Sequence, residues 1–262
     1  MKRKITILTI AFLSSMLMCA NAFAAATGRC GDSITWTLDD SGNLTLSGSG
    51  EMWNNGYDDS PFKDYEIRKA TVKYGITSIG ESAFLGCRGM TELTLPNSVT
   101  SIGGNAFEGC NGLEKIAVES GNSCYDSRDN CNSIIDTEFN TLIVGCKNSV
   151  IPNSVTSIGY YAFYGCSGLT ELTLPDSVAS IGDGAFICCS DLSKITSLAE
   201  IPPVCGSGVF DRVNKTNCEL IVPVVSVTAY KQAEVWNEFS NIRGFSGVEV
   251  TVAGKTRKIV VE

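Results

Sequence analysis

The sequence predicts an α+β repeat solenoid of short parallel strands with a cap at each end. The main observation is a phrase, Ala-Phe-x-x-Cys, that occurs four times. The separation is 23 residues within the first pair of copies and within the last pair, and 56 residues in between, which is one unit of 23 plus a longer unit of 33. Such a period is typical of a solenoid, in which each unit buries its apolar face on its neighbours. The copies are Ala83-Phe84/Cys87, Ala106-Phe107/Cys110, Ala162-Phe163/Cys166 and Ala185-Phe186/Cys189.

Each unit is predicted to hold two inward-facing segments and one large apolar side chain. Leu93 and Leu95 alternate with polar residues, as in a strand with one buried face. A Pro-Asn-Ser turn follows, because proline fixes φ and asparagine bonds its own backbone. Val99 and Ile102 begin the second inward segment. After a glycine turn, the Ala-Phe phrase is expected to start a short helical or 3₁₀ stretch that places Phe107 in the core.

The N-terminal region carries the pattern of a β-hairpin. Ile34, Trp36 and Leu38 alternate, an Asp-rich turn follows, and the alternation resumes at Leu44. This hairpin is expected to cover the first repeat. Glycine is misplaced in the turn for a calcium loop, so we interpret the turn as structural.

The C-terminal region is predicted to close the solenoid with a helix over 227–239. Ser226 suits its N-cap, and Tyr230 and Trp236 lie on one face. The last residues, 245–262, alternate apolar and polar residues around a glycine turn. They are interpreted either as an edge hairpin or as the stub of an attachment segment.

These repeats resemble a known family. The frame L-x-x-L-x-L followed by S-V-T-S-I-G-x-x-A-F-x-x-C is similar to the BspA-like leucine-rich repeat of bacterial surface proteins. Cys30-Gly31-Asp32 resembles the family's N-terminal cap, and Val235-Trp236-x-x-Phe239 its closing cap. The resemblance implies a right-handed leucine-rich-repeat coil that binds proteins at the bacterial surface, as an adhesin for host matrix proteins, host cells or other microbes. It divides the chain into a signal peptide (1–24), an N-terminal cap (25–66), repeats (67–225) with a variant unit at about 116–148, a helical cap (226–244) and a β tail (245–262).

The N-terminus predicts export. Lys2-Arg3-Lys4 precedes an apolar run, and Ala22-Phe23-Ala24 has the pattern of a cleavage site. Cleavage leaves 17 basic and 28 acidic residues, a net charge of −11. We therefore expect a secreted or cell-surface protein with no membrane insertion after cleavage. The acidic charge argues against nucleic acid or anionic lipid as a partner.

Eleven cysteines remain after cleavage. The four in the repeated phrase are predicted to form a column of buried thiols. Cys124 with Cys131, and Cys205 with Cys218, could each close a loop in an oxidising compartment, and the pairing of Cys30 and Cys146 is open. No C-x-x-C occurs, which argues against a zinc site.

The composition argues against catalysis. The chain has no histidine, which removes the Ser-His-Asp and Cys-His arrangements and most catalytic zinc sites. The adjacent pairs Asp39-Asp40 and Asp58-Asp59 lie in turns, where carboxylates face water. No phosphate-binding glycine motif appears. We expect no enzymatic activity, no cofactor and no bound metal.

The exposed strand positions offer a candidate binding surface. The residue before the second inward residue of each strand gives a row of alternating charge: Lys69, Glu92, Lys115, Asn148, Glu171, Lys194 and Glu219. The row is interpreted first as a ladder of charges that fixes strand register, with a ligand-facing stripe as the alternative. It contains no aromatic residue, so a glycan-binding sheet appears weak. Aromatic residues elsewhere, such as Trp53, Tyr57 and Tyr125, would favour a glycan if they formed one exposed patch.

The 33-residue variant unit is the candidate contact region. It breaks the period, it breaks the charge row at Asn148, and it is expected to project a hairpin from Ser133–Ile135 and Thr141–Val144. Insertions in a solenoid often lie on the binding face. The candidate partner-binding residues are Lys115, Asp126, Asp129, Asn148 and Glu171. The expected partner is a protein; a glycan, or no ligand at all in a structural spacer, are the alternatives.

Overall fold

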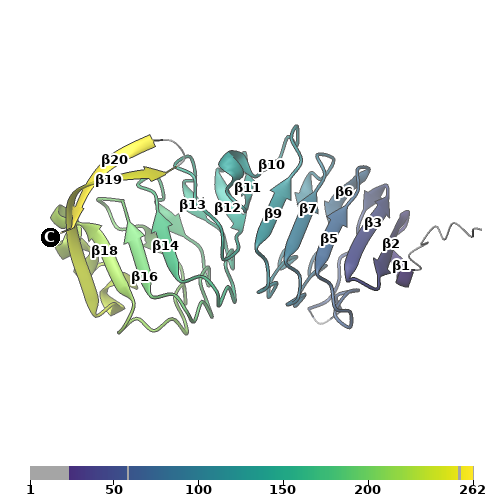
Figure 1. The fold of residues 1–262 in the computed structure, drawn as a ribbon, viewed down its shortest axis with the longest axis horizontal. Coiled ribbons are helices and arrows are strands. Elements are labelled where there is room, and N and C mark those ends of the chain that lie inside the picture. Colours follow the sequence, from purple (N-terminus) through teal and green to yellow (C-terminus); the bar gives the residue numbers. More distant parts are fainter. Residues whose placement is uncertain (1–23, 58, 253–254, 262) are drawn as a thin grey trace, which may run out of the picture.

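The chain folds into an elongated solenoid whose repeats stack along the long axis of the molecule (Figure 1). The computed structural model describes residues 24–57, 59–252 and 255–261. Residues 1–23 of the predicted signal peptide lie outside the described residues. The expected solenoid of short parallel strands is confirmed.

Within the described residues, the strands form four sheets. The first has the order β1 (Ala24–Gly31), β2 (Ile34–Asp39), β3 (Asn43–Gly48), β5 (Lys69–Val72), β7 (Glu92–Leu95) and β9 (Lys115–Val118). A short sheet holds β4 (Gly50–Glu51), β6 (Ile76–Ile79) and β8 (Ser101–Ile102). A third holds β10 (Tyr125–Asp126), β11 (Ile134–Asp136), β12 (Thr141–Val144), β13 (Ser157–Ile158), β15 (Ser180–Ile181) and β17 (Val204–Cys205). The last holds β14 (Glu171–Leu174), β16 (Lys194–Ser197), β18 (Glu219–Pro223), β19 (Asn241–Val252) and β20 (Lys255–Val261), with β19 and β20 paired as a hairpin.

The N-terminal cap is the predicted hairpin of β2 and β3 with one additional strand, β1, outside it. Trp36 lies opposite Leu46 across the hairpin, and both are buried. The Asp39 carboxylate accepts backbone hydrogen bonds of 2.9 Å from Ser41 and Asn43, which explains the Asp-rich turn as a structural one. Because β3 pairs in parallel with β5, the cap continues directly into the repeat ladder.

Equivalent residues of successive repeats lie side by side. The strand register joins the exposed row as predicted, Lys69–Glu92–Lys115 in the first sheet and Glu171–Lys194–Glu219 in the last. Ion pairs form at two of these steps, Lys69–Glu92 at 3.1 Å and Glu171–Lys194 at 3.3 Å. Since both pairs are exposed, each contributes roughly 0–1 kcal/mol. The row therefore helps to align strands more than it stabilises them.

The expectation of a short helical or 3₁₀ stretch at the Ala-Phe phrase is wrong, because the phrase forms consecutive turns. Alternate N–H groups of the phrase donate to the next repeat, and the N–H groups between them close turns within their own repeat. The Phe84 N–H donates to the Ala106 carbonyl at 2.8 Å, and the Phe163 N–H donates to the Ala185 carbonyl at 2.8 Å. Asn105, with φ at 55°, adopts the left-handed conformation that reverses the chain here.

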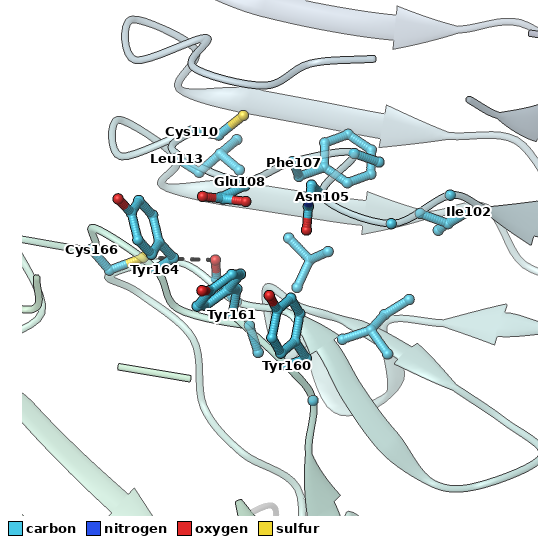
Figure 2. Close-up of a pocket in the computed structure, with 18 residues that line it drawn as sticks. Ile102, Asn105, Phe107, Glu108, Cys110, Leu113, Tyr160, Tyr161, Tyr164 and Cys166 are labelled. Atoms are coloured by element: carbon cyan, nitrogen blue, oxygen red, sulfur yellow. Dashed lines mark hydrogen bonds between the residues drawn. The ribbon is translucent and has the colours of Figure 1, made fainter. Parts of the chain in front are cut away.

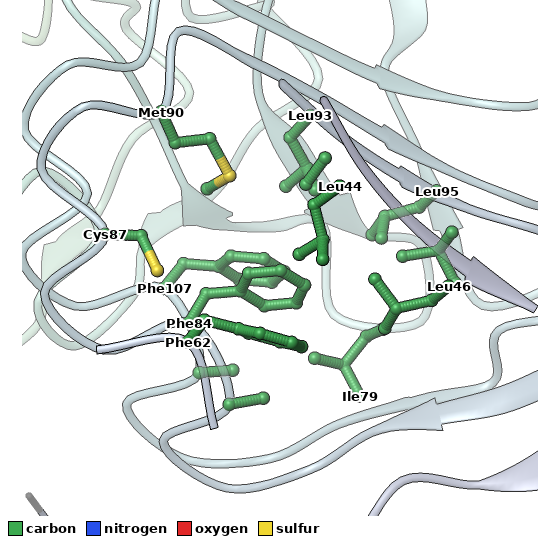
Figure 3. Packing of buried hydrophobic residues seen from close by; sticks show 14 of the residues in the cluster. Leu44, Leu46, Phe62, Ile79, Phe84, Cys87, Met90, Leu93, Leu95 and Phe107 are labelled. Atoms are coloured by element: carbon green, nitrogen blue, oxygen red, sulfur yellow. The ribbon is translucent and has the colours of Figure 1, made fainter. Parts of the chain in front are cut away.

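The phenylalanines of the phrase stack into two columns, and Figure 3 shows the first. Each column belongs to its own core cluster, one on either side of the variant unit. Successive rings are parallel or tilted and in contact. The stacked pairs are Phe62–Phe84, Phe84–Phe107, Phe163–Phe186 and Phe186–Phe210, with ring centroids 5.0, 5.2, 5.0 and 5.4 Å apart.

The variant unit has Gly145 where a regular unit has its phenylalanine. The Gly145 N–H donates to the Ala162 carbonyl at 2.8 Å, which is the bond that Phe84 and Phe163 make in their own units. A Cβ at this position would lie 2.2 Å from the Phe163 ring, so the close approach requires glycine. The aromatic column is interrupted at this point.

The hairpin predicted in the variant unit forms between β11 and β12, but it does not project. Ile134 and Ile135 are fully buried, and they belong to the N-terminal and the C-terminal core cluster, respectively. β12 then pairs in parallel with β13. The hairpin therefore joins the two halves of the core, and its tip at Phe139 is exposed.

The helix of the C-terminal cap is shorter than predicted. α1 spans Val227–Gln232, with 3₁₀ turns before it at Val224–Ser226 and after it at Trp236–Glu238. Ser226 occupies the N-cap position as predicted, but its side chain makes no capping bond. α1 ends where Ala233 adopts an extended conformation, and Val235, at φ 69°, then turns Trp236 into the core, where its Nε1 donates to the Pro203 carbonyl at 2.8 Å.

The four cysteines of the repeated phrase are buried as predicted: Cys87, Cys110, Cys166 and Cys189, each at most 5% exposed. The Cys110 thiol donates to the Phe84 carbonyl and the Cys189 thiol to the Phe163 carbonyl, both at 3.2 Å. Burial raises the pKa of the Cys166 thiol to about 12. All eleven cysteines of the described residues, including the two loop-closing candidates, are free thiols.

We expect these four thiols to resist labelling in the native protein. The thiolate is the reactive form, and both burial and the raised pKa remove it. A disulfide-exchange reagent, with sites mapped by mass spectrometry, should label Cys124 and Cys188 first, because both are half-buried, whereas burial raises the pKa of the half-buried Cys205 to about 12. The column should label only after unfolding in guanidinium, and fast native labelling there would contradict this packing.

Candidate functional site

The variant unit interrupts the solenoid on both of its faces. On the strand side, the first sheet ends at β9 and the last begins at β14. On the turn side, the unit has no Ala-Phe phrase, so the row of turns is also broken. Each interruption leaves a recess.

The strand-side recess is small and polar, and it is lined by Thr91, Glu92, Glu114, Lys115, Asn132 and Asn148. Two contacts bridge it. Lys147 pairs with the Glu114 carboxylate at 2.6 Å, and the Asn148 amide donates to the Glu114 carbonyl at 3.2 Å. Of the predicted site residues, Lys115 and Asn148 meet in this recess.

The other predicted site residues lie elsewhere. Asp126 pairs with Arg128 at 2.9 Å, and Arg128 also donates to Asn140. Asp129 is exposed in the 3₁₀ turn Arg128–Asn130. Glu171 pairs with a lysine on β16, as described above. None of these three lines the recess.

The turn-side recess is a more enclosed cleft of about 250 Å³. One wall is the segment 102–108, the opposite wall is the segment 159–164, and Ile143, Val144 and Gly145 form its floor. Figure 2 shows Asn105 and Glu108 on one side and the three tyrosines of the second wall on the other. The lining is mainly apolar, so a polar group inside it is poorly hydrated.

Glu108 is the charged group of this cleft. The residue is only 7% exposed. Its Oε1 accepts a hydrogen bond from the Tyr57 hydroxyl at 3.2 Å, whereas its Oε2 has no hydrogen-bond partner within the described chain. Removal from water raises the pKa of the Glu108 carboxyl, and the Tyr57 bond opposes this in part. A buried acceptor without a donor is costly to the fold and therefore invites a functional explanation.

Three tyrosines gather on the opposite wall. The Tyr160 and Tyr161 rings are 3.9 Å apart between centroids, and Tyr161 and Tyr164 are 5.4 Å apart. Tyr160 is 55% exposed, so part of this aromatic surface faces solvent. Together with Glu108 it offers ring faces and one carboxylate oxygen to a ligand.

A second, polar groove borders the cleft and shares Glu108 and Tyr164 with it. Its lining includes Lys63, Arg88 and Arg212. In the described part of the chain, no cation lies within ion-pairing distance of the Glu108 carboxylate. The groove adds positive charge beside the cleft without neutralising Glu108 by contact.

Sequence reasoning missed the turn-side cleft. The signal lies in the residue that follows each phenylalanine: Leu85, Glu108, Tyr164 and Ile187. Among the four copies of the phrase, this slot holds a carboxylate only at Glu108, directly before the variant unit that lacks the phrase, and this pattern could have indicated the cleft. The three aromatic residues named in advance do not form one exposed patch, because Tyr125 is buried.

Within the described residues, no group of three or more Cys, Asp or Glu side chains could hold a metal ion. No helix in that part of the chain is long and apolar enough to cross a membrane.

We expect Glu108→Gln to raise the melting temperature at about pH 7, and the gain to disappear near pH 4. The folded-state pKa lies above that of the unfolded chain, so the favourable protonated form is lost as pH rises through the folded value. Glutamine keeps an acceptor for Tyr57 and carries no charge. Calorimetry across this pH range tests the sign, with the exposed Glu81→Gln as the matched control. A larger loss of stability at neutral than at acid pH would mean that the carboxylate is stabilised in the fold.

Comparison with known proteins places the chain among bacterial repeat proteins. The family model described as BspA type leucine rich repeat region matches residues 57–143 and 132–222, with six copies. A leucine-rich repeat protein from Bacteroides ovatus is 27% identical, over 74% of this chain and 47% of its own, with a TM-score of 0.38. One from Eubacterium ventriosum is 21% identical, over 77% and 79% of the two chains, with a TM-score of 0.31.

A leucine rich cell surface protein from Faecalibacterium prausnitzii is 20% identical, over 69% of this chain and 57% of its own, with a TM-score of 0.35. Comparison with curated proteins gives no match. The family model spans more than half of the sequence, and its repeats coincide with the strands and turns described above. The chain therefore belongs to the BspA type leucine-rich repeat family.

Proposed function

We propose that this protein is a secreted or cell-surface scaffold that binds a protein partner, and that its activity is adhesion to host matrix or cell-surface proteins. The observation that carries the proposal is the double interruption at the variant unit. In the regular repeats, the exposed strand face is a flat row of charged and small side chains, and charged residues of neighbouring strands form ion pairs with one another. The variant unit instead has a recess on each face.

A protein partner suits the strand-side recess. Lys115 and Asn148 are exposed at its edge, and Lys115 is next to the end of the interrupted sheet. Glu92, on the other side of Lys115 in the register, is paired with Lys69. An exposed lysine and an amide at a shallow polar surface are typical of a protein interface rim.

A carbohydrate is the second candidate, and the tyrosines of the turn-side cleft favour it. Ring faces bind the apolar faces of sugars, and a carboxylate oxygen accepts hydrogen bonds from hydroxyl groups. A structural spacer without a ligand is the remaining alternative.

A binding screen separates these functions. The mature protein would be tested by biolayer interferometry against a panel of matrix proteins and on a glycan array. For any protein that binds, Lys115→Glu combined with Asn148→Ala should weaken binding by about tenfold or more. Lys231→Glu, an exposed charge reversal on α1, is the matched control and should leave binding unchanged.

The outcomes point in different directions. Equal binding by both variants would move the contact away from the strand-side recess. Binding on the glycan array alone would favour the carbohydrate function, and no binding on either would favour the spacer.

A further inference from the structure

The turn-side cleft lies where the variant unit lacks the Ala-Phe turn of a regular repeat. In regular repeats the chain leaves the second inward strand, makes the Ala-Phe turn and returns. In the variant unit, Gly145 follows β12 directly, and the chain returns without this turn. The neighbouring turns, 102–108 and 159–164, therefore become the walls of the cleft.

Regular turns are joined by a fixed ladder of hydrogen bonds. Alternate N–H groups of one turn donate to alternate carbonyls of the next turn. Before the cleft, the bonds are Ser82 to Gly104 at 3.0 Å, Phe84 to Ala106 at 2.8 Å and Gly86 to Glu108 at 2.8 Å. After it, they are Tyr161 to Asp183 at 3.1 Å, Phe163 to Ala185 at 2.8 Å and Gly165 to Ile187 at 2.8 Å.

At the cleft this ladder is open on both walls. The equivalent donors on the first wall are the N–H groups of Asn105, Phe107 and Gly109, and within the described chain none of them has an acceptor. On the second wall, Gly145 donates to the central carbonyl of Ala162, whereas the carbonyls of Tyr160 and Tyr164 have no donor among the described residues. Unpaired backbone groups spaced along a ladder are a template for another polypeptide segment.

The side chains beside the open ladder favour a positively charged ligand group. In stacked repeats, equivalent residues lie next to one another, so the residue missing between Glu108 and Tyr164 would lie against both side chains. Glu108 Oε2 has no partner within the described residues, and its surroundings are apolar. A cation would neutralise this buried carboxylate, and its stem would pack on the tyrosine ring.

We propose that the turn-side cleft binds a short, lysine-containing segment of a partner polypeptide, which takes the place of the missing turn. Its carbonyl groups accept hydrogen bonds from the N–H groups of Asn105, Phe107 and Gly109, and its lysine ammonium pairs with Glu108 Oε2. This inference rests on the proposed protein-binding function and deepens it by naming the ligand chemistry. A cleft of about 250 Å³ suits one side chain and its backbone better than a large rigid ligand.

Peptide mixtures test the inference without a known partner. Three sets of acetylated, amidated pentapeptides would carry lysine, norleucine or glutamate at the centre and mixed residues elsewhere, and binding to the mature protein would be measured by fluorescence polarisation. We expect the lysine set to bind about tenfold or more tightly than the norleucine set, and the glutamate set to bind least. Equal binding of the three sets would overturn the proposal.

Two variants test whether peptide binding depends on Glu108 and on the turn-side cleft. Glu108→Gln should abolish the preference for lysine over norleucine, whereas the matched control Glu81→Gln should keep it. Gly104 lines the cleft, and a Cβ there would meet no atom within 4 Å. Gly104→Phe should therefore fill the cleft without disturbing the fold, and it should remove binding of all three sets. A lysine preference that persists in Glu108→Gln or in Gly104→Phe would overturn the proposal.

A further pair of probes separates the backbone contacts from the charge. N-acetyl-lysine methylamide alone should bind about tenfold or more weakly than the lysine pentapeptides, because it offers few carbonyls to the open ladder. Equal binding of the two probes would mean that the cleft recognises only an ammonium group, and it would contradict the inserted segment. Binding of glycans, and not of lysine peptides, would favour the carbohydrate function.

The experiments distinguish a failure of the peptide-binding cleft from a failure of the proposed adhesive function. A matrix protein that binds the scaffold while no lysine peptide does would leave the function standing and overturn the cleft. Lysine peptides that bind while every panel protein fails would support the cleft and count against the adhesive function.

Discussion

Phe186→Ala is expected to lower the free energy of unfolding by about 3–5 kcal/mol. The side chain is fully buried, and it stacks between Phe163 and Phe210 with ring centroids 5.0 and 5.4 Å away. Truncation would remove contacts on both of its faces. The cavity cannot collapse easily, because the backbone layers on each side are held by the turn ladder. Urea denaturation followed by circular dichroism would measure the change.

Phe107→Ala provides the matched comparison, since it is the same substitution at the interrupted end of a column. Phe107 stacks on Phe84 at one face and lines the turn-side cleft with the rest of its surface. Its loss should be nearer 3 than 5 kcal/mol, because part of the cavity already exists. An equal or larger loss for Phe107 would show that the cleft is filled in solution or that the two columns do not behave as separate cores.

Much of the fold could be predicted because the same local pattern is repeated. A single unit with leucines at alternate positions does not determine a fold. Several such units at a fixed period bury their apolar faces together only when they stack on one another. That reasoning gave the strand register of Lys69, Glu92 and Lys115, and the burial of the cysteine column. Each of these features is a property of the repeat itself.

The sequence-based predictions are wrong where contacts with a neighbouring repeat determine the local conformation. The Ala-Phe phrase forms turns because its N–H groups bond to the next repeat, an acceptor that no local pattern can indicate. The helix of the cap ends early at an extended Ala233, and Val235 then adopts positive φ so that Trp236 can reach the Pro203 carbonyl. The variant hairpin was expected to project, and it is buried because Ile134 and Ile135 connect two cores.

The candidate site was only partly predictable for the same reason. Lys115 and Asn148 could be placed together because both belong to the aligned row. Glu108 could not, because the cleft that it lines depends on what is absent from a unit that begins after it in the sequence. A gap in a stack is recognised when the repeats are compared with each other, and it is hidden when each residue is interpreted in its own unit.

Trp236→Ala is expected to have the largest effect on stability, about 4–6 kcal/mol, because it combines a cavity with an unpaired carbonyl. The indole is fully buried, lies 5.4 Å from the Phe210 and Tyr230 ring centroids, and donates to the Pro203 carbonyl at 2.8 Å. It closes the end of the second aromatic column, and an uncapped solenoid end exposes apolar surface. The loss is comparable to the whole stability of many domains.

Trp236→Phe separates these two contributions. Phenylalanine keeps most of the ring contact but cannot donate to Pro203, so the loss should fall to about 1–3 kcal/mol. Hydrogen exchange would locate the effect, and fast exchange should be confined to β18 and the strands next to it while β5 and β7 stay protected. Uniform exchange along the whole chain would mean that the variant unit couples the two cores into one cooperative block. In that case a partner segment in the turn-side cleft would bind at the joint of a single rigid body, and its binding would stabilise both halves together.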